Sequence, residues 1–533
     1  MMLFWMLAIL VAGGILAWAA GRLDDRLSRW IAVCALGADL VLVAAVWIHN
    51  YRAVSLLESR SWLIELRWDW IPGFGASFHL AMDGLSLILL ALTIFLGLVA
   101  VVASWTEVRT RVGFFHFNLL WVLAGIAGVF LAADLFLFYF FWELMLVPMY
   151  FLIGIWGHER RVPAAFKFFL FTQAGGLAML LSILALYFIH GRATGVYTFE
   201  YAALAGTPLG AAAPWVMLGF LLAFLVKAPG VPLHTWLPDA HAQAPTGGSV
   251  ILAGLLLKTG AYGLIRFVLP LSPPALRVFA PFGMAIGVAG ILYGAKLAFA
   301  QSDLKRMVAY TSVSHMGFVL LGIFSLDGTA LQGVVLQIVC HGVSTGALFL
   351  LAGAIQERLR TRELSAMGGL WGEAPRMGGA ALLFALASLG LPGLGNFAAE
   401  FLILLGTFRA APVFAVAASL GLIASTIYAL SLFQRIFQGP KSAEAPFRDL
   451  GPREIGVLAA LALVIIWLGL YPQPLLDTSR AAVAGIQSAA APDRTSGIAS
   501  AHPASPAAAG PNVSPHVAGE PAGQAGRGKG GQR

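Results

Sequence analysis

Seven side chains that can bind or release a proton lie within or beside long apolar stretches of the sequence. An ionisable group is costly in an apolar medium, so such residues almost always face a protein interior or a water-filled cavity. A buried lysine can release a proton that an arginine would keep, and histidine titrates near neutral pH. These residue types therefore predict proton transfer between buried groups. The seven are Glu143, Lys227, His234, Lys258, His315, His341 and Glu400.

Most of these groups come out at a similar depth along their apolar stretches. Glu143 lies about ten residues, or about 15 Å, into its stretch, which is half of a hydrocarbon core about 30 Å thick. Lys227 and Lys258 each lie about fourteen residues into theirs, His315 about twelve and His341 about ten. One group from each of several helices predicts a row along the membrane plane rather than a pore across it.

Two of the stretches are interrupted by proline and glycine. The segment KAPGVP begins with Lys227 and is followed by His234, while LGLPGLGN at residues 389–396 precedes Glu400. A broken helix is tolerated at membrane depth where it is buried in protein or lines a wet cavity. We therefore expect the break to keep Lys227 near water and backbone dipoles, with His234 placed to relay protons.

Each group also has a simpler interpretation. Lys227 could serve only as a structural counter-ion for Glu143, although a buried Lys–Glu pair with coupled titration is also a proton switch. Core histidines are common without any function. Asp134 and Asp83 each begin an apolar stretch, where a helix cap is the simplest role. Asp39 lies deep in the second stretch without a basic neighbour in the sequence.

The elements that carry these residues are transmembrane helices. The chain has 533 residues, 59% hydrophobic and 11% charged, whereas a soluble domain carries about 25% charged residues. A span needs about 20 apolar residues, and the sequence predicts an all-α polytopic membrane protein with about fourteen spans. These are roughly 2–20, 30–48, 81–104, 114–131, 133–153, 164–189, 213–236, 244–268, 278–296, 303–325, 331–355, 380–405, 411–433 and 455–475.

The basic residues are distributed unequally between the two sets of loops. Of the 33 Lys and Arg residues, nineteen fall in loops after odd-numbered spans and seven in the other loops. The positive-inside rule places the richer set in the cytoplasm, so with an even number of spans both termini are expected on the outer side of the membrane. Five more basic residues lie in the C-terminal tail, which leaves Lys227 and Lys258 inside spans. The formal net charge of +8 therefore does not indicate nucleic acid.

The chain divides into a membrane domain over residues 1–475 and an Ala-, Pro- and Gly-rich tail over 476–533 that is expected to be disordered. Spans 7 and 12 are both broken and lie five apart in order, which is typical of repeated transporter halves. Spans 4–8, about 114–268, and 9–13, about 278–433, are the expected repeats. An offset of five spans gives the two repeats opposite orientations in the membrane.

Neither a metal nor a redox cofactor is expected in this chain. No two carboxylates or histidines within a span have the i, i+3 or i+4 spacing of a metal site, and no phosphate-binding or dinucleotide motif is present. Cys34 and Cys340 do not form a Cys-x-x-Cys motif, so they are interpreted as small packing residues.

Several motifs together resemble one family. FLVKAPGVPLHTWLPDAHAQAPTGGSVILAGLLLKTGAYGLIR at 224–266, AQSDLKRMVAYTSVSHMGFVLLG at 300–322 and FHLAMDGLSLILL at 78–90 resemble the antiporter-like subunits of respiratory complex I and related cation/proton antiporters. The resemblance covers about residues 1–475. It implies fourteen helices with two inverted five-helix repeats, and proton translocation through the buried lysines and glutamates.

The twelfth span carries the feature that distinguishes members of this family. GLGNFAAEFLILLGTF at 393–408 contains Glu400, where L- and N-type subunits usually have lysine, so the chain is similar to the M-type subunit of bacterial NADH:quinone oxidoreductase. The resemblance implies L- and N-type neighbours in the membrane arm, with FMN, iron–sulfur clusters and quinone held by other subunits. It also implies that redox energy from the peripheral arm drives this subunit.

Two other functions use the same buried charges. A subunit of a Na⁺/H⁺ antiporter would also need them, but Glu400 argues against it. A structural membrane scaffold would use them only to fix helix packing. In the preferred hypothesis, a charge change from a neighbouring subunit separates Glu143 from Lys227, and the lysine proton then passes through water, histidine or Lys258 towards Glu400.

Overall fold

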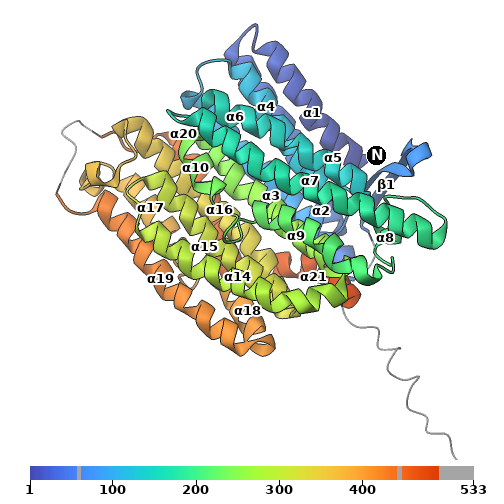
Figure 1. Cartoon of the computed structure of the whole chain (residues 1–533). Helices are drawn as coiled ribbons and strands as arrows, with labels where there is room; N and C mark the ends of the chain where they lie inside the picture. The colour runs from blue at the N-terminus through green and yellow to red at the C-terminus, as the bar shows by residue number, and fades with distance from the viewer. Residues whose placement is uncertain (57–61, 441–446, 491–533) are drawn as a thin grey trace, which may run out of the picture. The chain divides into compact units, whose positions relative to one another are not determined.

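The computed structural model describes residues 1–56, 62–440 and 447–490, and for 52–56 the backbone alone. Within this part, thirteen helices are long and apolar enough to cross a membrane. The predicted twelfth span is divided between α17 and α18, which are each shorter than a spanning helix. The prediction of an all-α polytopic membrane protein is confirmed in its class (Figure 1).

The helices follow the predicted apolar stretches closely. Their bounds are α1 Met2–Ala20, α2 Asp25–Leu56, α3 Gly84–Glu107, α4 Val112–Leu131, α5 Leu135–Leu144, α6 Leu146–Trp156, α7 Arg161–Thr194, α8 Tyr201–Leu204, α9 Ala213–Lys227, α10 Trp236–Gln243, α11 Thr246–Ile251, α12 Leu257–Gly263, α13 Leu269–Leu271, α14 Pro273–Phe299, α15 Leu304–Phe324, α16 Gly328–Leu359, α17 Pro375–Ser388, α18 Gly395–Ala410, α19 Pro412–Phe437, α20 Pro452–Leu470 and α21 Gln473–Ala490.

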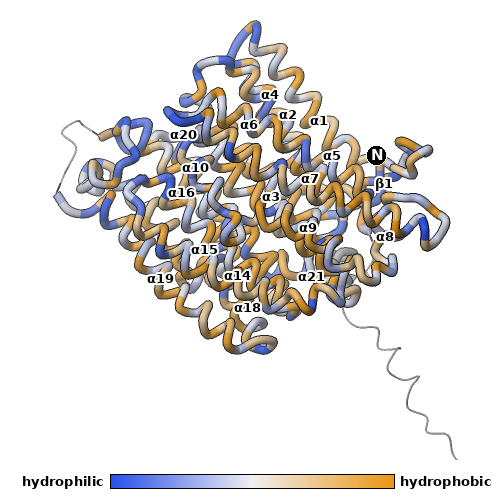
Figure 2. The backbone as a smooth tube through the Cα atoms, in the orientation of Figure 1, coloured by the Kyte–Doolittle hydropathy of each residue, from blue (hydrophilic) through white to orange (hydrophobic). Residues whose placement is uncertain are grey.

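The helices divide into a buried centre and an apolar periphery. The most apolar windows of α15 and α16, and of the eighth span from Thr246 to Leu271, are 94% to 100% buried. Those of α1, α2, α19 and α20 are at most 39% buried, and they expose large apolar side chains. Figure 2 shows hydrophobic residues along peripheral helices such as α7 and α9. The central helices are therefore the ones that can shelter charges, while the outer ones offer an apolar surface to lipid or to partners.

Both predicted helix breaks are present. The seventh span stops at Lys227 and resumes at Trp236, and the twelfth stops at Ser388 and resumes at Gly395. Lys227 ends the first half of its span, whereas Glu400 lies in the second half of the other. The two charges therefore do not occupy corresponding positions in the two broken spans. The inverted repeats stay a prediction.

The region predicted as an outer loop at 49–80 contains a β-hairpin instead. Strand β1 (Ile64–Ile71) pairs antiparallel with β2 (Ala76–Met82), and Gly75 supplies the left-handed turn residue with φ of 66°. Trp68 lies opposite Phe78 and their rings stack at 5.7 Å, a cross-strand pair that stabilises such a hairpin. The apolar–polar alternation of β1 (IELRWDW) is the signal that could have predicted this strand.

The expected tail begins later than residue 476. Helix α21 extends over Gln473–Ala490 and packs against α2, α3, α13 and α16. Leu475, Ser479, Val483 and Ile486 form its buried face, and the Trp47 indole N–H donates to Thr478 Oγ1 at 3.1 Å. The prediction of disorder was wrong over 476–490, because small residues hide this helical periodicity. Residues 491–533 lie outside the described part of the chain.

Candidate functional site

Lys227 is buried at the end of α9 without a conventional partner. Its side chain is among the largest fully buried ones, and its Nζ has no hydrogen-bond partner within the described residues. The ammonium lies 5.3 Å from the ring centroid of Trp142 and 5.4 Å from that of Phe168. Aromatic faces attract a cation but accept no proton. Lys227 is therefore held as a charge whose counter-ion is not in direct contact.

The helix break positions Lys227 by replacing lost backbone hydrogen bonds. The indole N–H of Trp236 donates to the carbonyl of Val226 at 2.9 Å, and the Gly230 N–H donates to Leu225 at 2.8 Å. On the other side, a Cβ at Gly260 would lie 2.6 Å from the backbone nitrogen of Ala228. The absence of a side chain there lets α12 approach the break closely, which fixes where the lysine begins.

Glu143 lies on α5, the helix that also contributes Trp142. Its Oε1 has no hydrogen-bond partner within the described residues, and a Cβ at Gly176 would lie 2.6 Å from that oxygen. No ion pair within 4.0 Å joins Glu143 to Lys227 in the described chain, although the two charges interact electrostatically. The Glu143–Lys227 pair therefore interacts at a distance, with the Trp142 ring beside the lysine ammonium.

Four of the predicted residues form a contiguous buried cluster, which we call the central relay: Lys258, His341, His315 and Glu400. Lys258 Nζ lies 2.6 Å from His341 Nδ1 and donates to the Ala253 carbonyl at 2.5 Å. The His341 and His315 ring centroids are 5.6 Å apart, and His315 Nδ1 lies 3.1 Å from Glu400 Oε1. Each side chain is at most 2% exposed. The central relay thus joins a cation to a carboxylate through two imidazoles.

The local backbone helps to place Lys258. The eighth span contains two π-helical stretches, η3 at Leu252–Leu256 and η4 at Leu264–Val268, on either side of α12. Widened turns of this kind occur often at functional sites. Here the carbonyl of Ala253, in the first of them, accepts the lysine ammonium.

Three residues that the sequence did not single out complete the Glu400 end. Gln337 Nε2 donates to Glu400 Oε1 at 3.1 Å. Ser388 Oγ and Tyr428 Oη each lie 3.1 Å from His315 Nε2. Ser388 is the last residue of α17, so the second helix break contributes directly to the relay. Neutral polar residues within apolar spans give no charge signal, which is why sequence reasoning missed them.

His234 does not join the others. It lies within the first break at 4% exposure, with its ring 5.8 Å from that of Tyr293 and 6.3 Å from that of Tyr310. Its Nδ1 has no hydrogen-bond partner among the described residues. The structure thus places His234 against α14 and α15, beside the break, and within the described residues it forms no hydrogen bond with Lys227 or Lys258.

Two basic residues assigned to loops by sequence are in fact buried. Arg266 is 6% exposed and pairs with Asp83 at 2.5 Å, and Asp83 also caps α3 by accepting from the Ser86 N–H. Lys305 is fully buried at the start of α15. Lys227 and Lys258 are therefore not the only buried cations, because residues at span edges can turn inwards.

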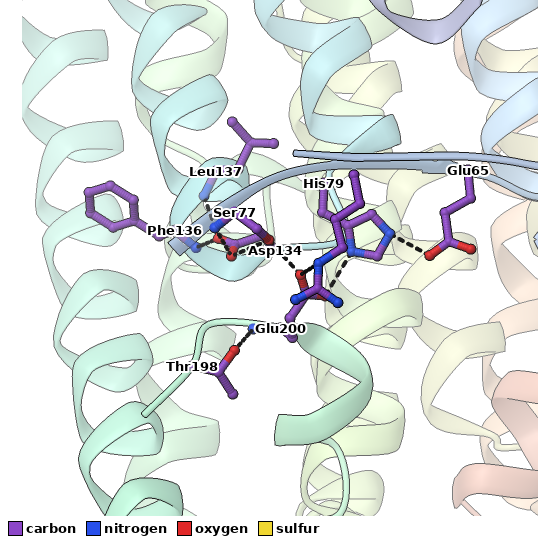
Figure 3. Close-up of polar contacts among 9 residues, drawn as sticks. Glu65, Ser77, His79, Asp134, Phe136, Leu137, Thr198 and Glu200 are labelled. Carbon is purple, nitrogen blue, oxygen red and sulfur yellow. Dashed lines mark hydrogen bonds and ion pairs between the residues drawn. The ribbon is translucent and has the colours of Figure 1, made fainter. Parts of the chain in front are cut away.

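A second polar cluster lies at the loops after spans 2, 4 and 6 (Figure 3). Asp134 caps α5 through the N–H groups of Phe136 and Leu137, as its position indicated, and also accepts from the Ser77 N–H at 3.0 Å. His79 lies 2.7 Å from both Glu200 Oε2 and Glu65 Oε1. Arg67 lies 3.3 Å from Glu200 Oε1. These contacts fasten the hairpin to the end of the helix that carries Glu143.

The electrostatics of this hairpin cluster favour charged partners. Burial lowers the pKa of His79, but the hydrogen bond and negative charge of Glu200, with the charge of Glu65, outweigh burial and raise it overall. For Glu200, burial is outweighed by hydrogen bonds from His79 and Ser77, so its pKa is lowered. Burial raises the pKa of Asp134. Each partner of the His79–Glu200 pair therefore favours the ionised form of the other.

Residues 132–427 match the family described as NADH:quinone oxidoreductase/Mrp antiporter, TM. The NADH-quinone oxidoreductase subunit M of Pseudomonas aeruginosa is 53% identical over 498 residues, covering 91% of this chain and 97% of that protein. The subunit of the same description from Escherichia coli (strain K12) is 50% identical over 499 residues, covering 91% and 98%.

Two solved structures share the fold. A chain of respiratory complex I from Thermus thermophilus with bound NADH aligns with a TM-score of 0.81 at 32% identity, covering 92% of this chain and 99% of that one. A chain of the Mrp complex from a Dietzia species aligns with a TM-score of 0.79 at 23% identity, covering 92% and 98%. The second likeness is one of fold alone.

Proposed function

The chain belongs to the NADH:quinone oxidoreductase/Mrp antiporter family of membrane subunits, and from that membership we propose that it is the proton-translocating M-type subunit in the membrane arm of an NADH:quinone oxidoreductase. The observation that carries the proposal is the central relay. Lys258, His341, His315 and Glu400 join four separate spans through buried, titratable nitrogen and oxygen atoms.

Protons move through the relay by exchange between these atoms. Lys258 donates to His341 Nδ1 at 2.6 Å, the proton passes to His315 across the 5.6 Å between ring centroids by way of water, and His315 donates to Glu400 at 3.1 Å. Each step moves one proton and no electron. Gln337, Ser388 and Tyr428 hold the accepting end in place.

Glu143 and Lys227 act as the electrostatic input to the relay. The pair interacts without a contact ion pair, so a change of charge near Glu143 alters the energy of the Lys227 ammonium directly. Lys227 then loses its proton towards the relay. The relay begins at Lys258 on α12, the helix that approaches the break closely because Gly260 has no side chain. Redox chemistry takes place in other subunits, which would hold FMN, iron–sulfur clusters and quinone.

The neighbours and the orientation follow from the same proposal. L- and N-type subunits flank the chain in the membrane arm of the bacterial inner membrane. The cytoplasmic side is the one where the loops after odd-numbered spans lie, and both termini face the periplasm. The basic excess of those loops supports this assignment.

The direct test is Lys227→Ala in the assembled complex. We expect NADH-driven proton translocation in vesicles to fall sharply, because neutral alanine cannot carry the input charge. Normal translocation by an assembled complex would contradict the proposal and favour a scaffold role. Glu143→Gln distinguishes the same two functions, since a scaffold predicts normal pumping.

A Na⁺/H⁺ antiporter subunit would show a different ion dependence. The fold shared with the Mrp complex keeps that function in view. We expect proton translocation by this chain to require electron transfer and to be independent of Na⁺. Sodium-dependent proton exchange without an electron donor would support the antiporter instead.

A further inference from the structure

We propose that Lys305, His158 and His241 form a proton-loading path. It would lead to Lys258 from the side of the membrane where the loops rich in Lys and Arg lie. This inference rests on the proposed function, since it names how the central relay would be refilled. Each transfer moves one proton between two nitrogen atoms, directly or through water, and no bond other than N–H or O–H changes. The proposal stands on a cavity, a buried cation beside it and an unused buried histidine.

The cavity opens among the loops that the count of Lys and Arg residues places on one side of the membrane. It has a volume of about 630 Å³ and is lined by residues from the connections after spans 3, 5, 9 and 11. Glu107, His158, Asp303, Arg360 and Arg362 are among them. Charged walls of this kind hold water and concentrate protons and counter-ions near the surface. Buried titratable groups lie next to this cavity.

Lys305 and His158 connect the cavity wall to the interior. Lys305 is fully buried, while His158 is half-buried and lines the cavity. Lys305 Nζ lies 3.2 Å from His158 Nε2 and 3.2 Å from the Ala244 carbonyl. Burial and the charges of Lys305 and Arg362 lower the pKa of His158 to about 3. His158 is therefore neutral at ordinary pH, and its ring can accept a proton and pass one on.

His241 is the buried histidine that the proposal places between Lys305 and the relay. It belongs to α10, the second half of the broken seventh span, and it is fully buried with its ring stacked on Phe349 at 4.4 Å. Neither ring nitrogen has a hydrogen-bond partner within the described residues. The ring is electrostatically coupled to both Lys305 and Lys258, and to His341. A buried imidazole without partners is costly, and a relay role explains why it is present.

Three other charged groups near Lys305 are held by partners of their own. Glu107 is coupled to the lysine charge, while its carboxylate accepts from the Thr246 N–H at 3.0 Å. Asp303 caps α15 and pairs with Arg362 at 3.2 Å, and Arg362 donates to the Ala242 carbonyl at the end of α10. The cavity wall and the half-helix of His241 are thus tied together around Lys305.

A purely structural role for Lys305 is the competing explanation. Its ammonium binds the carbonyl of Ala244, the C-cap of α10, where a cation stabilises a helix end. Arginine can serve the same end, because it keeps the charge and donates to a carbonyl, but it does not release its proton. The substitution Lys305→Arg therefore separates the two roles.

The experiment measures proton uptake per electron transferred in vesicles containing the whole complex. We expect Lys305→Arg and His241→Gln to lose redox-driven proton uptake to the extent that Lys227→Ala does, with assembly intact. Lys296→Arg, at the end of α14 and outside the path, is the matched control and should retain uptake. Normal uptake with both Lys305→Arg and His241→Gln, when Lys227→Ala is impaired, would overturn the loading path alone. Normal uptake in all three would overturn the proposed function too.

His241→Gln introduces no larger side chain, so it tests the proposal even where the arginine of Lys305→Arg does not fit. If Lys305→Arg disrupts assembly, the result for His241→Gln decides the proposal. A loss of uptake in that variant supports it, and normal uptake contradicts it.

Discussion

At the scale of single residues, Lys227 and Lys258 differ in the partners that their ammonium groups find. Lys258 touches a histidine and a carbonyl, whereas Lys227 lies between two aromatic rings. A proton can leave Lys258 along a hydrogen bond. Lys227 instead responds first to the electric field of nearby charges. The division of work between input and relay follows from this difference.

The position of Glu143 depends on Gly176. A methyl group there would lie 2.6 Å from Glu143 Oε1, so Gly176→Ala must displace the carboxylate or distort α7. We expect reduced proton translocation with all titratable residues retained. Gly154→Ala is the matched control, since its Cβ would meet only Ala165 at 3.6 Å. Equal translocation by the two variants would contradict the importance of this placement.

Docking of the hairpin should depend on pH. Glu200 has a lowered pKa, so its contribution to stability is lost as pH falls through that value; His79 has a raised pKa, so its contribution is lost as pH rises through that value. Protection of the β2 amides from hydrogen exchange should therefore be greatest between the two values. His79→Gln should remove the loss on the alkaline side. Protection that does not vary with pH, after correction for intrinsic exchange, would count against this pairing.

Residue types predicted much of the site, but contacts did not follow from depth alone. Lys258, His315, His341 and Glu400 form one cluster, as a row at one depth indicated. His234 does not join them, because spacing along a helix fixes height but not the direction in which a side chain points. Gln337 and Tyr428 carry no charge and gave no signal.

At the scale of elements, the first break is stabilised by a side chain from its own far side. The Trp236 indole binds the Val226 carbonyl just before Lys227. Trp236→Phe would leave that carbonyl buried without its donor, at a cost of about 1–3 kcal/mol. We expect a lower midpoint of thermal unfolding and impaired pumping. The control Trp215→Phe removes a 74% exposed indole and should have little effect. Equal midpoints would show that the indole does not hold the break.

Long apolar spans and both breaks were predictable because each follows from a strong local signal. A run of about twenty apolar residues predicts a span, and a Pro–Gly pair predicts a break. Each of these signals lies within a few turns of one helix. The hairpin and α21 were not predicted, since Trp68–Phe78 stacking and the Trp47–Thr478 hydrogen bond join segments whose own patterns are weak. Tertiary packing decides such elements.

At the scale of the whole described membrane unit, the two sets of loops build two different sites, the cavity and the hairpin cluster. Connections after spans 3, 5, 9 and 11 line the 630 Å³ cavity, and connections after spans 2, 4 and 6 build the hairpin cluster. This separation is what an alternating chain of spans produces. It makes the sidedness of the chain directly testable.

A membrane-impermeant thiol reagent should label the two sets from opposite sides. Arg26→Cys, in the exposed first turn of α2, should react only when the cytoplasmic side is accessible, and Ala193→Cys, near the end of α7, only from the periplasmic side. The parent chain controls for Cys34 and Cys340. Labelling of both sites from one side would contradict the topology, and exchanged labelling would reverse the proposed orientation.

The most direct measurement of the central relay is NADH-driven proton translocation by the complex carrying Glu400→Gln. The glutamine keeps the shape of the side chain and can still meet His315 and Gln337, but it cannot take up the proton. Loss of translocation in an assembled complex is predicted, with Asp25→Asn, an exposed carboxylate exchanged in the same way, unaffected. Translocation by Glu400→Gln at the rate of the parent complex would contradict a proton path through this relay.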